Sequence, residues 1–74
     1  MDEFSIHTEY IELNKILKIM HWVETGGQAN QVIEDGLVKV NGQVEFRKRN
    51  KLRPGDTVTF DDSFTVKITN HPQE

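Results

Sequence analysis

The sequence predicts an α+β domain in which two short helices pack on a small antiparallel β-sheet. Three observations predict this class. Apolar residues over 13–20 repeat at helical spacing, a glycine closes a second helical stretch at position 36, and apolar and polar residues alternate from position 37 onward. Helices followed by a run of short strands are typical of α+β domains. With 74 residues, the chain is expected to form one domain over 1–74.

The first predicted helix rests on a single apolar stripe. Ile16, Leu17 and Met20 follow Leu13 by three, four and seven positions, so the four residues share one face of a helix. Before this helix, the alternation in 4–6 predicts a short opening strand.

The second predicted helix begins at a capping box. The Thr25 hydroxyl is expected to accept a hydrogen bond from the Gln28 amide, and the Gln28 side chain to reach back to Thr25. Ala29, Val32 and Ile33 then form one apolar face. Gly36 is expected to end the helix, because the residue past a helix end often needs a positive φ. The helix is short, so it must pack on the first one.

The remaining chain predicts four strands. Asn41-Gly42 is a strong hairpin signal between two alternating stretches, one with Val38 and Val40 and one with Val44 and Phe46. Turns are expected at 54–56 and 61–63, with strands at 57–60 and 64–68. The predicted core consists of Leu13, Ile16, Leu17, Met20, Ala29, Val32, Ile33, Val38, Val40, Val58, Phe64 and Val66.

Positive charge is concentrated in one segment of an otherwise acidic chain. Residues 39–53 hold six of the nine Lys and Arg residues and only one acid, Glu45, which gives a net charge of +5. Residues 1–38 have a net charge of −5, and residues 54–74 have −3. Such a basic patch favours a polyanionic partner. The alternative interpretation is a solvated charge run, or a charged edge that prevents one sheet from pairing with another.

The order of these pieces resembles the RNA-binding domain of the ribosomal-protein-S4 type, also called the αL motif. The resemblance runs over about 13–60 and is carried by Leu37-Val38-Lys39-Val40-Asn41-Gly42 and, later, Pro54-Gly55-Asp56. The run RKRNKLR at 47–53 resembles the compact stand-alone bacterial members. The resemblance implies binding to structured RNA, ribosomal or transfer, with the ribosome as a candidate partner and with no catalysis. The absence of cysteine fits a protein of the reducing cytoplasm.

This sequence departs from the family at its second helix. The family usually has a Ser-Arg-x-x-Ala-Arg pattern there, whereas Gly26 and Asn30 stand at the two arginine positions and Glu34 at a third, often basic position. The helix start still offers exposed amides to a phosphate. In an extended chain, alternate residues of the basic run would share one side. The RNA-binding candidates are therefore Lys39, Arg47, Lys48, Arg49, Lys51 and Arg53, together with Thr25, Gly26, Gly27 and Gln28.

Several other side chains have two interpretations. Trp22 and Phe46 either stack on an unpaired base or close a small core. Lys15 and Lys18 lie off the apolar stripe and are interpreted as a solvated helix face. The three histidines have no metal-ligand spacing and the chain has no cysteine, so neither a metal site nor a cofactor is expected.

Other classes of protein find little support. Asp61-Asp62 is interpreted as a turn rather than a carboxylate pair, and no nucleophile and base are arranged for catalysis, so neither an enzyme nor a small-molecule substrate is expected. No apolar run approaches the roughly 18–20 residues that span a bilayer, and the N-terminus lacks the features of a signal peptide. A protein-interaction module for an acidic partner remains the alternative. A ubiquitin-like sulfur carrier is disfavoured, because the sequence ends in 70–74 without Gly-Gly.

Overall fold

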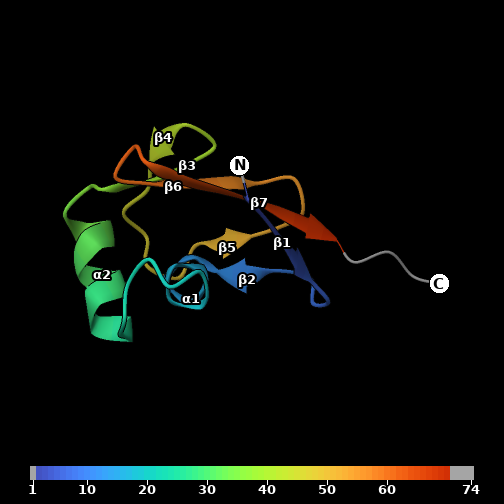
Figure 1. The fold of residues 1–74 in the computed structure, drawn as a ribbon, viewed down its shortest axis with the longest axis horizontal. Helices are drawn as coiled ribbons and strands as arrows, with labels where there is room; N and C mark the ends of the chain where they lie inside the picture. The colour runs from blue at the N-terminus through green and yellow to red at the C-terminus, as the bar shows by residue number, and fades with distance from the viewer. Residues whose placement is uncertain (1, 71–74) are drawn as a thin grey trace.

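The computed structural model describes residues 2–70, which form two helices and seven strands (Figure 1). The predicted opening strand is confirmed and is longer than expected. In chain order the elements are β1 (Asp2–Ile6), β2 (Ile11–Glu12), α1 (Leu13–Ile19), α2 (Gly26–Glu34), β3 (Val38–Val40), β4 (Gln43–Val44), β5 (Lys51–Leu52), β6 (Thr57–Phe60) and β7 (Phe64–Asn70).

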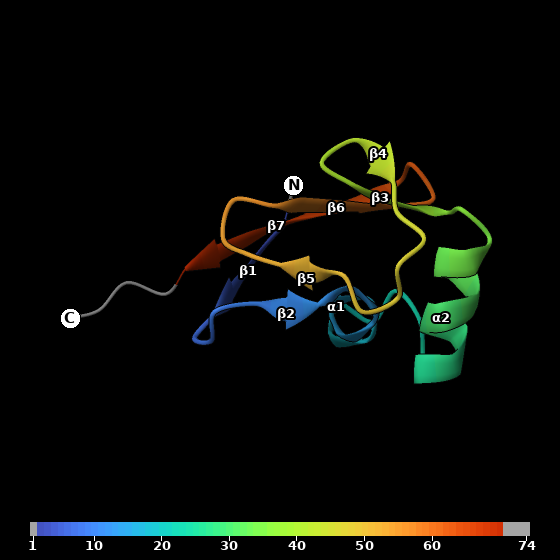
Figure 2. The same cartoon turned by 180° about the vertical axis from the view of Figure 1, so that it is seen from behind.

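The main sheet is antiparallel except at one edge. Its strand order is β1-β7-β6-β3-β4, and β1 pairs with β7 in parallel, with Phe4 opposite Ile68. The prediction of an antiparallel sheet therefore holds for β7, β6, β3 and β4, whereas β1 makes the sheet mixed. A parallel pair needs a long connection between its strands, and here the whole domain lies between β1 and β7. A separate two-stranded ribbon, β2–β5, lies beside α1 (Figure 2).

Both helices form where their apolar faces predicted them. In α1, Leu13, Ile16 and Leu17 are buried. At the start of α2 the Gln28 amide donates to the Thr25 hydroxyl over 3.1 Å, as predicted. The reciprocal bond differs, because the Gln28 Oε1 accepts from the amide of Glu24 over 2.7 Å instead of that of Thr25. The box thus closes one residue earlier than predicted.

The turns follow their local chemistry. Gly36 has a φ of 78° just beyond α2, and Asn41 and Gly42 have φ values of 53° and 86° in the β3–β4 hairpin. Asp61 and Asp62 also have positive φ, which confirms the turn predicted there. The strand after the hairpin is shorter than predicted, since β4 ends at Val44 and Phe46 lies outside it.

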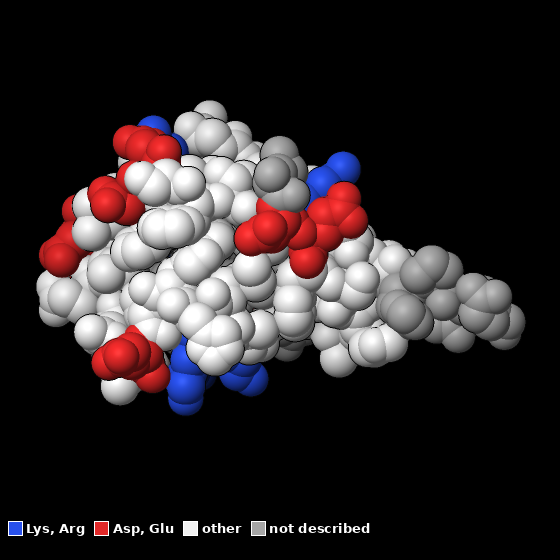
Figure 3. Space-filling view, viewed as in Figure 1, with Lys and Arg blue, Asp and Glu red and all other residues white. Residues whose placement is uncertain are grey.

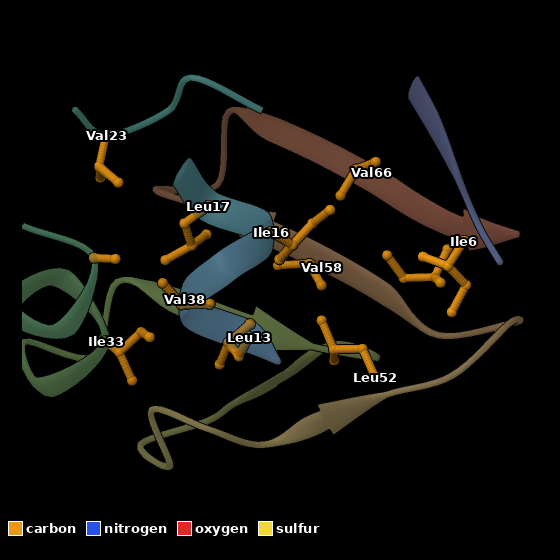
Figure 4. Packing of buried hydrophobic residues seen from close by; sticks show 12 residues of the cluster. Ile6, Leu13, Ile16, Leu17, Val23, Ile33, Val38, Leu52, Val58 and Val66 are labelled. Atoms are coloured by element: carbon orange, nitrogen blue, oxygen red, sulfur yellow. The ribbon is translucent and has the colours of Figure 1, made fainter. Parts of the chain in front are cut away.

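The core lies between α1 and the main sheet, closed by α2 and by the β2–β5 ribbon (Figure 4). Met20, Val32 and Val40 pack at its edge. The prediction for Phe64 was wrong, because this side chain is 51% exposed at the beginning of β7, where its ring packs against those of Trp22 and Phe60. The buried residues are Ile6, Leu13, Ile16, Leu17, Val23, Ala29, Ile33, Val38, Leu52, Val58, Val66 and Ile68.

Sequence patterns missed four of these buried residues, namely Ile6, Val23, Leu52 and Ile68. The burial of Leu52 was not predicted, because it lies between Lys51 and Arg53 in the most highly charged stretch of the chain. Neither helix within residues 2–70 is long and apolar enough to cross a lipid bilayer.

Candidate nucleic-acid interface

Four basic side chains gather around one open hollow of about 490 Å³. These four side chains were predicted to share one side because the chain would be extended. They do lie together, but the chain around them is not extended throughout. Only Lys51–Leu52 forms a strand, and 47–50 forms a turn in which the Asn50 amide donates to the Arg47 carbonyl over 3.2 Å. A turn followed by a short strand brings the side chains together. The hollow is lined by Arg47, Arg49, Asn50, Lys51 and Arg53.

The loop that carries these charges caps the first helix. The side chain of Glu12, at the N-cap of α1, accepts no capping hydrogen bond from the helix amides. Instead, the Leu13 amide donates to the Asn50 carbonyl over 2.9 Å, and the Asn14 amide donates to the Lys48 carbonyl over 3.0 Å. These are amides that a helix cannot satisfy internally. The loop over residues 45–50, which connects β4 to β5 in Figure 2 and is called the basic loop below, is therefore attached to α1 through main-chain hydrogen bonds.

Arg47 is held by the one acid of the basic segment. Its guanidinium contacts both carboxylate oxygens of Glu45, with Nε–Oε2 at 2.9 Å and Nη2–Oε1 at 3.1 Å. The Arg47 amide also donates to Oε2 over 2.9 Å. These bonds lower the pKa of the Glu45 carboxyl and raise the pKa of the Arg47 guanidinium. Arg47 lines the hollow with its charge already partnered.

Besides Lys48, two groups of predicted residues lie outside the hollow. Lys39 on β3 contacts the Asp62 carboxylate over 2.9 Å and does not line the hollow. The start of α2, over 25–28, also lies apart from it, and the acidic side chain of Glu24 directly precedes this helix start. The structure therefore does not join these residues to the basic loop in one site.

The other three basic side chains of the hollow have no acidic partner in the part of the chain that the structure describes. Within residues 2–70, Arg49, Lys51 and Arg53 form no ion pair with a carboxylate. All three line the hollow, and all three are exposed. The face drawn in Figure 3 shows a different character, with Asp and Glu prominent and Lys and Arg only at its edges. Four of the nine Lys and Arg residues of the chain thus line one hollow.

Sequence reasoning missed an aromatic residue beside the hollow. The ring centroid of Tyr10 lies 4.9 Å from the Lys51 Nζ and 6.0 Å from the Arg53 Cζ, both within cation–π range. Tyr10 reaches these cations because β2, which follows it, pairs with β5. No local pattern indicates a pairing between strands so far apart in the sequence.

The two aromatic residues with open interpretations behave differently. Trp22 packs against the core and its ring centroid lies 6.1 Å from that of Phe60, as expected of an aromatic that closes a small core. Phe46 is 61% exposed, so it does not close the core, and its ring lies near Gly36.

The fold and the matched sequence decide the family. A family model of the S4 domain matches residues 4–69. The chain belongs to the S4 domain family. It is 49% identical over 51 residues to a protein of Escherichia coli strain K12 named "Putative RNA-binding protein YbcJ", covering 69% of this chain and 73% of YbcJ. It is 32% identical over 66 residues to the "Probable ribosome maturation protein RlbA" of Bacillus subtilis strain 168, covering 89% and 93%.

Solved structures confirm the predicted fold class for this S4 domain. The solution structure of E. coli YbcJ, described as revealing an αL motif involved in RNA binding, matches with a TM-score of 0.71 and 41% identity, over 93% of this chain and 87% of that one. The crystal structure of a pseudouridylate synthase matches with a TM-score of 0.65 and 25% identity. That match covers 70% of this chain but 22% of the synthase chain, so it concerns less than a quarter of the enzyme.

The structure shows what replaces the basic second helix in this S4 domain. Asn30, at one arginine position of the family pattern, accepts a hydrogen bond of 3.2 Å from the Asn14 side chain and so joins α2 to α1. Glu34, at a third position, forms an ion pair with Lys48 of the basic loop. Lys48 does not line the hollow. Two positions at which α2 departs from the pattern expected of the family therefore hold the helices and the loop together.

Proposed function

We propose that this S4 domain binds structured RNA, ribosomal or transfer, and catalyses no reaction on it. The observation that carries the proposal is the basic hollow, in which Arg49, Lys51 and Arg53 have no carboxylate partner within residues 2–70. The names of YbcJ and RlbA support an RNA partner, and the name of RlbA favours the ribosome and hence the cytoplasm.

The hollow suits phosphates better than base edges. A guanidinium binds a phosphate through two parallel hydrogen bonds, and Arg49 and Arg53 line the hollow together with Lys51. Because the Asn50 and Lys48 carbonyls are bonded to α1, the loop is held in place before RNA arrives. Such an arrangement reads the shape and backbone of folded RNA rather than a base sequence.

The other basic candidates take smaller parts in this proposal. Lys39, Arg47 and Lys48 each contact a carboxylate, so RNA must compete with that acid for them. The exposed amides of Gly26 and Gly27 offer a separate, weaker contact at the start of α2. We therefore place the centre of the interface at the hollow.

The test is binding to three labelled nucleic acids across a salt series. Fragments of ribosomal RNA, transfer RNA and duplex DNA of equal length should be compared at several salt concentrations. A preference for RNA is expected, and each phosphate contact should contribute about 0.7–0.9 to the slope of log affinity against log salt. Equal, weak binding to all three would contradict the proposal.

A second experiment separates RNA from an acidic protein partner. The tagged protein should be recovered from cell extract with and without ribonuclease. Partners joined through RNA should be lost on ribonuclease treatment, whereas a directly bound acidic protein should remain. Retention of the same partner in both samples would favour the protein-interaction module.

A further inference from the structure

Tyr10 belongs to the outward face of the β2–β5 ribbon. Ile11 is opposite Leu52 in this ribbon, and Glu12 is opposite Lys51. Leu52 is buried and Ile11 packs against the core, so these two residues face inward. Because neighbouring residues of a strand point to opposite faces, the outward residues are Tyr10, Glu12, Lys51 and Arg53. An aromatic ring is thus surrounded by charge on the exposed side of the ribbon.

Tyr10 lines a second hollow and lies within cation–π distance of Lys51 and Arg53, which line the basic hollow. The second hollow is open, has a volume of about 670 Å³ and is lined by two acids and one lysine. Its charge is negative on balance, because Lys15 pairs with Glu12 over 4.0 Å and leaves Glu9. The second hollow is lined by Thr8, Glu9, Tyr10, Ile11, Glu12 and Lys15.

The backbone at Tyr10 is held in place beside these hollows. The Thr8 hydroxyl donates to the Tyr10 carbonyl over 2.8 Å, and the strand pairing of β2 begins at the next residue. The ring is half-buried, so part of its surface remains accessible. Lys51 and Arg53 fix the ring further, because cations are attracted to its π-electrons.

The charges decide which part of a nucleotide suits each hollow. Phosphates are attracted to the basic hollow and repelled from the second hollow, where Glu9 and Glu12 lie. Carboxylates accept hydrogen bonds from the amino groups of bases. A base extended from a backbone that follows Lys51 and Arg53 would therefore meet the Tyr10 ring and, beyond it, the acceptors of Glu9 and Glu12.

We propose that Tyr10 is a stacking platform for one unpaired RNA base, next to phosphates held by the basic hollow. This inference rests on the proposed RNA-binding function and adds a contact that phosphate binding alone does not require. Stacking on an aromatic side chain is a common way in which proteins hold unpaired bases. The platform makes the protein prefer RNA with an unpaired base over a continuous duplex.

The experiment compares two RNAs that differ by one nucleotide. One is a hairpin with a fully paired stem closed by a non-nucleotide linker, here called the paired hairpin, so that it has no unpaired base. The other carries in the same stem a single bulged 2-aminopurine, whose fluorescence is quenched when it stacks. Wild-type protein and Tyr10→Phe should both quench the bulge, and Tyr10→Leu should not. For Tyr10→Leu we expect roughly five- to 100-fold weaker binding to the bulged RNA. Binding to the paired hairpin should change less than about twofold, with the same salt slope.

A matched control is Phe64→Leu. Phe64 is also an exposed aromatic, but it packs with Trp22 and Phe60 and lines neither hollow. This variant should quench the bulge as wild type does. Thermal unfolding of each variant shows whether the fold is retained.

The outcomes separate this inference from the proposed function. Absence of quenching by the wild type would overturn the stacking platform, whatever the folding of the variants. An equal loss of affinity for both RNAs in Tyr10→Leu would also overturn the stacking platform. In either case, salt-dependent binding of the paired hairpin would leave the proposed function standing. A wild type that binds neither RNA would overturn both.

Discussion

The backbone amide of Leu13 donates a hydrogen bond of 2.9 Å to the carbonyl of Asn50, which joins the first turn of α1 to the end of the basic loop. The helix obtains the acceptor that its own N-cap residue, Glu12, does not supply. The loop obtains a fixed position, so that its cations need little ordering when an RNA binds. The same bond therefore serves the fold and the candidate interface.

Charge reversal in the hollow should weaken RNA binding without unfolding the protein. We expect Arg49→Glu to bind RNA more weakly and to lower the salt slope by at least about 0.7, the share of one phosphate contact. Its free energy of unfolding should stay within about 0.5 kcal/mol of wild type, because Arg49 is exposed and unpaired within the described residues. Binding titrations in a salt series and chemical denaturation measure the two effects.

The control for Arg49→Glu is Lys67→Glu, which makes the same change in net charge. Val66 and Ile68 are buried, so Lys67 points to the opposite face of β7, away from α1. It should bind RNA nearly as wild type does. Equal weakening by both variants would mean that net charge, and not the hollow, governs binding.

Removing the charge of Glu45 should strengthen RNA binding by releasing Arg47. In Glu45→Gln the guanidinium loses its carboxylate partner and becomes available to a phosphate, so the salt slope should steepen by about 0.7–0.9. Glu3→Gln is the matched control, since Glu3 is an exposed acid on β1 outside the hollow. A similar gain in both variants would show that only the net charge matters.

The same pair predicts a dependence of stability on acid pH. Arg47 lowers the pKa of the Glu45 carboxyl in the folded protein below its usual value of 4.5. The stabilisation is therefore complete above the unfolded pKa and is lost as pH falls through the lower, folded pKa. Denaturation at several pH values should show a smaller decline for Glu45→Gln than for wild type. Identical pH profiles would contradict a stabilising pair.

Truncation of Leu52 should destabilise the core of the domain, to which this side chain anchors β5. Leu52→Ala removes a fully buried side chain, and such changes cost about 2–5 kcal/mol of the free energy of unfolding. Leu37→Ala is the comparison, because Leu37 is 40% exposed and its truncation should lower the free energy of unfolding much less. Chemical denaturation measures both. Similar losses would mean that Leu52 does not anchor the ribbon as the structure indicates.

Two substitutions of glycine by alanine should have different effects on the free energy of unfolding. Gly36→Ala forces a side chain into a backbone with φ of 78°, which costs roughly 1–2 kcal/mol. Gly26→Ala lies in the first turn of α2 with open space around the added methyl, so it should be neutral or should stabilise by up to about 1 kcal/mol. Thermal or chemical unfolding gives the comparison. A stabilising Gly36→Ala would contradict the observed end of α2.

Local patterns predicted the elements whose structure depends on near neighbours. The stripe from Leu13 to Met20, the cap at Thr25, the Asn41-Gly42 hairpin and the stop at Gly36 each follow from residues a few positions apart. The S4 resemblance arose from these same turns and from their order. The limits of local reasoning appear at Phe64, where strand alternation suggested burial although the side chain is 51% exposed at the beginning of β7 and packs against the rings of Trp22 and Phe60 at the surface.

By itself, the sequence determined where the two helices and the turns at 41–42, 54–56 and 61–63 form and that positive charge gathers in 39–53, because those properties depend on residue type and local spacing. Only the tertiary structure decided which of those charges are unpaired. Glu34 reaches Lys48 from α2, and Asp62 reaches Lys39 from the turn after β6, through packing that brings distant segments together. The parallel β1 edge and the cations around Tyr10 have the same origin, since strand pairing between remote segments depends on the whole core.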